Sequence, residues 1–226
     1  MSYLRVLDLS YNRFKKIQHL GIWRLCQLKQ LIASSNPINF EVTDSPKNIS
    51  ECSQFALERL DLSDCLNGIV PESLGRLANL RSLDLSDSSL TGTIPEALGR
   101  LRYLEALDLS FNQLNGSIPE SLGRLVNLRD ITLTVNRLTG TIPEALGRLR
   151  YLEALDLSLN QLDGSIPESL GRLANLRSLD LSDSSLTGTI PESLGRLRYL
   201  EELDLSRNQL DGSIPESFGK STALKS

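Results

Sequence analysis

A 24-residue unit recurs along this chain and constrains the fold more than any other feature. One copy, LRYLEALDLSFNQLNGSIPESLGR, occupies residues 101–124. Leucines in the pattern L-x-x-L-x-L at a period of about 20–29 residues predict a solenoid, in which each repeat supplies one strand and a short helical return. The second leucine of each repeat is Leu4, Leu28, Leu57, Leu80, Leu104, Leu128, Leu152, Leu176 or Leu200.

Each repeat can be read in detail. In RSLDLSD (81–87), strand alternation predicts that Leu83 and Leu85 point inward. The segment L-x-G-x-I-P predicts a second short strand, after which proline opens a helical turn and glycine, such as Gly123, ends it. A small hydrogen-bonding residue follows each first strand, and we expect it to bond backbone groups of neighbouring turns. This position holds Asn112, Asn136, Asn160 and Asn208, with Ser88, Ser184 and Cys65 as substitutes.

The predicted fold is therefore an α/β solenoid. We expect a right-handed superhelix with a parallel concave β-sheet, short second strands, and 3₁₀ or short helices on the convex side. Residues 1–226 form one domain of about nine repeats in this interpretation. Residues 1–76 are irregular, with a loop insertion near 36–56; residues 77–220 are regular; and 221–226 form a truncated end.

The motif LxGxIPxxLGxLxxLxxLxLSxNxL, which runs through 57–220, resembles the plant-type extracellular leucine-rich repeat of receptor-like kinases, receptor-like proteins and polygalacturonase inhibitors. The stretch 24–65 is similar to a repeat pair of plant receptor-like proteins. This resemblance implies an extracellular or cell-surface protein that recognises a protein or peptide ligand through its concave or lateral face.

The regular repeats are unusually uniform. Residues 77–124 and 173–220 are identical at 42 of 48 positions. This uniformity favours an engineered consensus scaffold that presents a concave protein-binding surface. The alternatives are a natural receptor-like ectodomain fragment that recognises a peptide or pathogen protein, and a hydrolase inhibitor.

Charge and composition exclude several classes of function. The formal net charge of −4 argues against a nucleic-acid partner, and we expect the arginines to be paired with nearby glutamates. No apolar run approaches a membrane span, and no signal peptide is visible, so recombinant or cytoplasmic expression is expected. Neither end carries a polar cap, which predicts a monomer or weak self-association through the ends.

Stacking the repeats turns equivalent positions into columns. The first exposed column alternates in sign from Glu58 onward and is interpreted as a register and solubility device. The third column carries carboxylates, with Thr132 between Asp108 and Asp156. A hard cation could bind such a row, but no second ligand type converges on it, so no metal site is predicted.

The fifth column varies most and holds the predicted binding patch. Phe111, Val135 and Leu159 come from consecutive repeats and should touch along the concave rim. Apolar contacts bordered by charge are typical of a protein or peptide contact. The candidate ligand-binding residues are Phe111, Val135, Leu159, Asp87, Asp183, Asp130, Thr132, Asp108 and Asp156.

The sequence offers no catalytic constellation and no cofactor motif. The only histidine, His19, lies near Trp23 in a segment interpreted as surface. Cys26 and Cys52 could form a disulfide, whereas Cys65 is expected to be a buried free thiol. Asn48 and Asn115 are N-glycosylation sequons that matter only if the chain is secreted.

Overall fold

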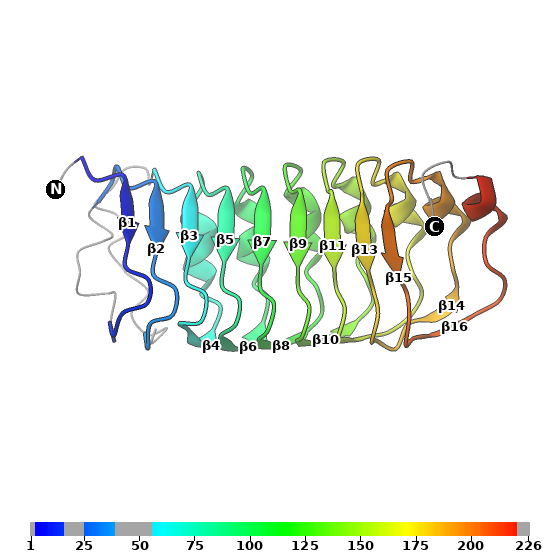
Figure 1. The fold of residues 1–226 in the computed structure, drawn as a ribbon, viewed down its shortest axis with the longest axis horizontal. Coiled ribbons are helices and arrows are strands. Elements are labelled where there is room, and N and C mark those ends of the chain that lie inside the picture. The colour runs from blue at the N-terminus through cyan, green and yellow to red at the C-terminus, as the bar shows by residue number, and fades with distance from the viewer. Residues whose placement is uncertain (1–2, 16–24, 39–55, 221–226) are drawn as a thin grey trace.

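Parallel strands, one from each repeat, form the main sheet of the protein (Figure 1). The structure is a computed structural model that describes residues 3–15, 25–38 and 56–220. Within these residues the sheet has nine strands: β1 (Val6–Asp8), β2 (Gln30–Ile32), β3 (Arg59–Asp61), β5 (Ser82–Asp84), β7 (Ala106–Asp108), β9 (Asp130–Thr132), β11 (Ala154–Asp156), β13 (Ser178–Asp180) and β15 (Glu202–Asp204).

The register of this sheet follows the sequence repeat. Leu83 lies opposite Leu107, and Leu155 opposite Leu179, each pair 24 residues apart. Leu83 and Leu85 are both buried, which confirms the predicted alternation. Because the inward leucines stack in register, the core continues from repeat to repeat without a break from Leu28 to Leu200.

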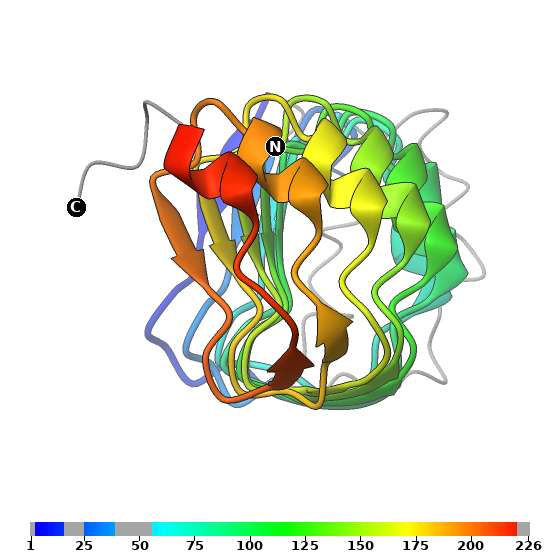
Figure 2. The same ribbon diagram turned by 90° about the vertical axis from the view of Figure 1, so that its right-hand side faces the viewer.

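A second set of strands follows the first along another side of the solenoid (Figure 2). Its register differs, since Thr91 pairs with Gln113, 22 residues later. In the described part of the chain it forms two sheets. The first contains β4 (Asn67–Ile69), β6 (Ser89–Thr93), β8 (Gln113–Gly116), β10 (Arg137–Gly140) and β12 (Gln161–Leu162), and the second contains β14 (Thr187–Thr189) and β16 (Gln209–Asp211).

Short 3₁₀ helices form the remaining side (Figure 2). Each follows an extended proline, has a glutamate in its first turn, and, up to η10, ends on an arginine. This charge order complements the partial charges at the ends of a helix. The helices are η5 (Glu72–Arg76), η6 (Glu96–Arg100), η7 (Glu120–Arg124), η8 (Glu144–Arg148), η9 (Glu168–Arg172), η10 (Glu192–Arg196) and η11 (Glu216–Lys220).

The glycine of this helix has a different role from the predicted one. Gly123 lies inside η7 rather than at its end, and it does not have a positive φ. A Cβ on Gly123 would stand 2.5 Å from the Ala145 carbonyl oxygen in η8. The glycine is therefore required because successive helices approach closely, whereas Gly116 in the second strand has the φ of 72° that favours glycine.

Buried asparagines join successive repeats, as the sequence predicts. The Asn136 side-chain amide donates to the carbonyls of Leu109 (2.9 Å) and Leu133 (3.1 Å). Its Oδ1 accepts from the Leu114 N–H (2.9 Å). These bonds satisfy backbone groups that the tight turn would otherwise leave buried without partners.

Candidate functional site

Every residue of the fifth column has a left-handed backbone conformation. The φ angles of these nine described residues lie between 50° and 54°: Tyr11, Ser35, Asp64, Asp87, Phe111, Val135, Leu159, Asp183 and Arg207. Non-glycine residues rarely adopt this conformation, and it is least favourable for a β-branched residue such as Val135. Because all nine repeats share it, the conformation belongs to the fold, and the side chain at this position is not dictated by the backbone.

Phe111, Val135 and Leu159 form what we call the apolar turn patch. Phe111 is 51% exposed and Leu159 48%, whereas Val135 is half-buried. The backbone continues the ladder of the main sheet here, since the Phe111 N–H donates to the Thr134 carbonyl (3.0 Å) and the Leu159 N–H to the Ser182 carbonyl (3.0 Å). Rigid backbone therefore presents the three side chains from consecutive repeats at the edge of the sheet face.

The two aspartates that border the patch differ. Asp183 Oδ1 lies 3.1 Å from Arg207 Nη1, so its charge is partly neutralised by the next repeat. Asp87 is exposed and makes no such ion pair with any described residue. The negative end of the patch is therefore on the Asp87 side.

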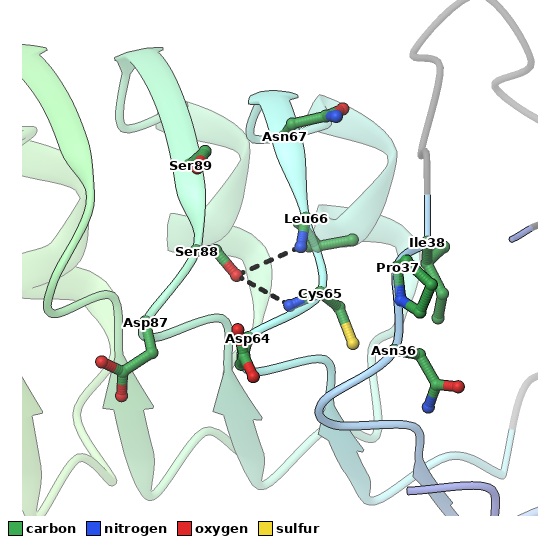
Figure 3. A pocket seen from close by; sticks show the side chains of 10 residues that line it. All are labelled: Asn36, Pro37, Ile38, Asp64, Cys65, Leu66, Asn67, Asp87, Ser88 and Ser89. Atoms are coloured by element: carbon green, nitrogen blue, oxygen red, sulfur yellow. Dashed lines mark hydrogen bonds between the residues drawn. The ribbon is translucent and has the colours of Figure 1, made fainter. Parts of the chain in front are cut away.

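A polar pocket of about 330 Å³ lies at that end, between β4, the start of β6 and residues 36–38 (Figure 3). Asp64 and Asp87 contribute to its lining, and the Ser88 hydroxyl accepts from the N–H groups of Cys65 (3.3 Å) and Leu66 (3.2 Å). Cys65 is a buried free thiol, as expected, and burial raises its pKa. The thiol thus stays protonated at neutral pH and is not an activated nucleophile.

The aspartates of the third column accept hydrogen bonds within their own repeats. Asp108 Oδ1 accepts from the N–H (2.9 Å) and hydroxyl (2.6 Å) of Ser110, and Asp156 accepts in the same way from Ser158. Thr132 has no carboxylate, and in its repeat Thr134 bonds the Ser158 hydroxyl instead (2.7 Å). Among the described residues no group of three or more potential metal ligands converges, and each acid of the row serves its own turn.

Burial and neighbouring charge act on two carboxylates of this face. Burial raises the pKa of Asp84, and the carboxylates of Asp108 and Asp61 add to the rise. Burial also raises the pKa of Asp130, with a further contribution from Glu153, while Arg129 opposes it. The sheet face beside the apolar turn patch therefore carries closely spaced acids, and burial disfavours the ionised forms of Asp84 and Asp130.

The first column forms ion pairs, but they are discrete. Lys29 pairs with Glu58, Arg81 with Glu105, Arg129 with Glu153 and Arg177 with Glu201. The expectation that arginines in general are neutralised by glutamates is wrong for the described residues. The arginines that end η5 to η10, and those in the bends after three of these helices, form no ion pair with any residue that the structure describes.

Several predicted sites lie outside the described residues. They include His19, Trp23, Asn48 and Cys52, so the Cys26–Cys52 disulfide stays a prediction. Asn115 lies in β8 with an exposed side chain, and its glycosylation is likewise untested. The described residues contain no helix long and apolar enough to cross a bilayer.

The parallel sheet, the second strands and the 3₁₀ returns define a repeat solenoid with one open sheet face. Residues 40–207 match the profile described as a leucine-rich repeat region, and residues 3–25 and 199–221 match that of a single leucine-rich repeat. The chain belongs to the leucine-rich repeat family. A comparison with curated protein sequences finds no match.

Solved structures show which members of the family it is similar to. The plant peptide hormone receptor RGFR1, in complex with RGF2, is 34% identical with a TM-score of 0.89 over 99% of this chain and 35% of the receptor chain. The ectodomain of the Arabidopsis receptor kinase HAESA, with an IDA peptide hormone ligand, is 37% identical with a TM-score of 0.84 over 98% and 36%. A plant ice-binding protein is 31% identical with a TM-score of 0.76 over 96% of this chain and 68% of that protein. The chain thus spans about a third of the receptor ectodomains, and it is a plant-type leucine-rich repeat protein.

Proposed function

We propose that this chain is a non-enzymatic scaffold that binds a peptide or protein segment on the open face of its main sheet, centred on the apolar turn patch. The observation that carries the proposal is the constant left-handed backbone of the fifth column combined with variable, exposed side chains. A position whose conformation is fixed but whose side chain is free suits specific recognition. Rigid presentation also lowers the entropy lost on binding.

The character of the ligand follows from the surroundings of the patch. Phe111 and Leu159 offer apolar area, Asp87 places negative charge at one end of the patch, and Asp130 adds a carboxylate further along the sheet face. A segment with apolar side chains followed by a cationic group would complement both. The peptide complexes of the similar receptors support this class of ligand.

The near-identity of 77–124 and 173–220 supports an engineered consensus array as the origin of the regular repeats. A natural receptor-like fragment would use the same patch. A hydrolase inhibitor is the remaining alternative, and co-purification of a secreted glycosidase from plant apoplastic fluid would favour it over peptide recognition.

The test is selection of peptides from a displayed random library against the whole chain. The selected peptide should lose measurable affinity for the variant Phe111→Ser/Val135→Ser/Leu159→Ser. A matched control, Ile69→Ser/Val126→Ser/Ile214→Ser, removes as many exposed apolar side chains elsewhere and should bind normally. Equal affinity of both variants would move the site away from the patch.

The similarity to an ice-binding protein supports a second candidate function, adsorption to ice. An exposed hydroxyl recurs in the six regular repeats, at or just after the end of the second strand: Thr93, Ser117, Thr141, Ser165, Thr189 and Ser213. The Thr141 methyl lies 2.8 Å from where a Cβ on Gly164 would stand, so it packs against that glycine and its rotamer is fixed. A regular row of oriented hydroxyls is the kind of surface that could order water.

Inhibition of ice recrystallisation tests this candidate. Thr141→Lys/Thr189→Lys should abolish inhibition, whereas Glu144→Lys/Glu192→Lys, on the 3₁₀ side, should not. An unmodified protein without inhibition excludes the candidate and leaves peptide recognition unaffected.

A further inference from the structure

The polar pocket at the Asp87 end of the apolar turn patch combines apolar and acidic lining (Figure 3). Ile38 and Leu66, both buried, supply apolar surface, and Asp64 and Asp87 supply two carboxylates. None of the described residues that line it is basic. Burial is the main cause of the raised pKa of Cys65, and the negative charge of Asp64 adds to the rise, so this charge acts inside the pocket.

The pocket lies where two consecutive repeats have short side chains. Cys65 and Ser88 occupy the position that holds an asparagine in most other repeats, and both line the pocket. The Ser88 hydroxyl accepts from the N–H groups of Cys65 and Leu66 and donates to the Ser86 carbonyl (3.1 Å). The Cys65 thiol donates to the Ala33 carbonyl (2.7 Å). These polar groups are used within the fold, so the carboxylates are the groups of the pocket that remain for a ligand.

The two carboxylates lie on neighbouring turns. The Asp64 N–H donates to the Ser86 carbonyl (2.9 Å), which places Asp64 beside Asp87 (Figure 3). Neither carboxylate forms an ion pair or a hydrogen bond with a described residue, whereas Asp183 in the same column pairs with Arg207. Like charges on adjacent turns, about 5 Å apart, repel each other, and a cation held between them would remove the repulsion.

We propose that this pocket receives an arginine side chain of the peptide that binds the apolar turn patch, an inference that rests on the proposed function for the peptide as a whole. The guanidinium group lies between the carboxylates of Asp64 and Asp87, and its methylene stem lies over Ile38 and Leu66. Arginine fits this site better than lysine because its planar fork offers several N–H donors in fixed directions to carboxylates from two turns.

The pocket is continuous with the patch, and this sets the spacing of the peptide. The Asp87 N–H donates to the Ser110 carbonyl (3.0 Å), which joins the Asp87 turn to the turn of Phe111. At the usual strand spacing, the midpoint between Asp64 and Asp87 is about 7 Å from Phe111. Alternate residues of an extended peptide are separated by about the same distance and lie on one face. The arginine should therefore lie two positions from the apolar residue that contacts Phe111.

The first experiment tests the pocket without a peptide. N-acetyl-arginine methylamide is titrated into the whole ¹⁵N-labelled chain, and the amide signals of Leu66, Asn67 and Ser89 should shift. The citrulline compound has nearly the same shape and no charge, and it should shift these signals at least about 10-fold less. Equal shifts with the two compounds, or no shift up to about 20 mM of the arginine compound, overturn the proposal. Larger shifts with the lysine compound overturn the choice of arginine.

The second experiment uses the peptide selected from the displayed library. Asp64→Asn/Asp87→Asn should weaken its binding about 10-fold or more, because charge-assisted hydrogen bonds are lost. The control Asp163→Asn/Asp211→Asn makes the same change in net charge away from the pocket and should change affinity less than about 2-fold. Equal weakening in the two variants would show that net charge, and not the pocket, attracts the peptide. The substituted aspartates are all exposed, and thermal unfolding should confirm that both variants fold.

The same peptide separates failure of the pocket from failure of the patch. Normal binding to Asp64→Asn/Asp87→Asn, together with loss of binding to the Phe111→Ser/Val135→Ser/Leu159→Ser variant, overturns the pocket and leaves the patch in place. The opposite result supports the pocket and overturns the patch.

Discussion

Two stretches of this protein have the same sequence and different structures. Residues 77–96 and 173–192 both read LANLRSLDLSDSSLTGTIPE. The first forms a five-residue second strand, β6, whereas the second forms the three-residue β14. The Ser88 hydroxyl is fully used in hydrogen bonds, while the equivalent hydroxyl of Ser184 is buried without a partner.

The preceding repeat explains the difference. The turn of the repeat that precedes Ser88 is one residue shorter than the turn of the repeat that precedes Ser184. It brings the N–H groups of Cys65 and Leu66 within reach of a short side chain. The turn before Ser184 has full length and is spaced for an asparagine, as Asn160 shows by accepting from the Leu138 N–H (3.0 Å). The strand ladder between β12 and β14 is broken, although the Ser185 N–H still donates to the Leu162 carbonyl. The two identical sequences thus differ in structure because the strand and hydrogen bonds of each stretch depend on the preceding repeat.

The largest expected effect on stability comes from replacing a buried asparagine by alanine. Asn136→Ala removes the hydrogen bonds to Leu109, Leu133 and Leu114 and leaves buried backbone groups unpaired. The free energy of unfolding should therefore fall by about 3 kcal/mol. Urea denaturation measures the loss. Ser184→Ala, which removes a hydroxyl that has no partner, should stay within about 0.5 kcal/mol of the parent protein. Equal losses would contradict the contrast between the two positions.

The next effect compares an interior repeat with the last one. Gly123→Ala forces a Cβ against the Ala145 carbonyl and should cost about 1–3 kcal/mol. Gly219→Ala makes the same change where nothing lies within 4 Å, and thermal unfolding should be unaffected or slightly improved. If Gly123→Ala left the stability unchanged, successive 3₁₀ helices could move apart without a loss of stability.

Placing an asparagine at position 184 should increase stability by a smaller amount. Ser184→Asn supplies an acceptor for the Leu162 N–H and donors for nearby carbonyls, so stability should rise by about 1 kcal/mol. Ser88→Asn is the matched control, and it should bring no gain because Ser88 already bonds two N–H groups. A similar gain at both positions would show that the length of the preceding turn does not matter.

The smallest effect concerns two aspartates of the same column. Burial raises the pKa of Asp84, whereas the Ser206 hydrogen bonds lower the pKa of Asp204 in the exposed last strand. Stability from protonated Asp84 should be lost as pH rises through its folded pKa, and stability from ionised Asp204 should be lost as pH falls through its own. Carboxyl NMR titration should place the Asp84 midpoint above the Asp204 midpoint, and the reverse order would show that burial of Asp84 is not decisive.

The sequence by itself determined the solenoid. Its period specified the main sheet, its alternation specified Leu83 and Leu85 as core, and the buried asparagines were recognised because small amides suit a tight turn. These features are local or repeat identically, so one repeat predicts the next. The candidate patch was found in the same way, from the column that varies most.

Tertiary structure decided the features that depend on two repeats together. The close approach at Gly123 and the contrast between Ser88 and Ser184 arise from the distance between neighbouring turns, and the left-handed turn at Phe111 recurs in all nine described repeats. A repeat pattern states which residues recur but not how far a side chain must reach. That distance is set when the core leucines pack, and it decides which polar groups find partners and which remain exposed for binding.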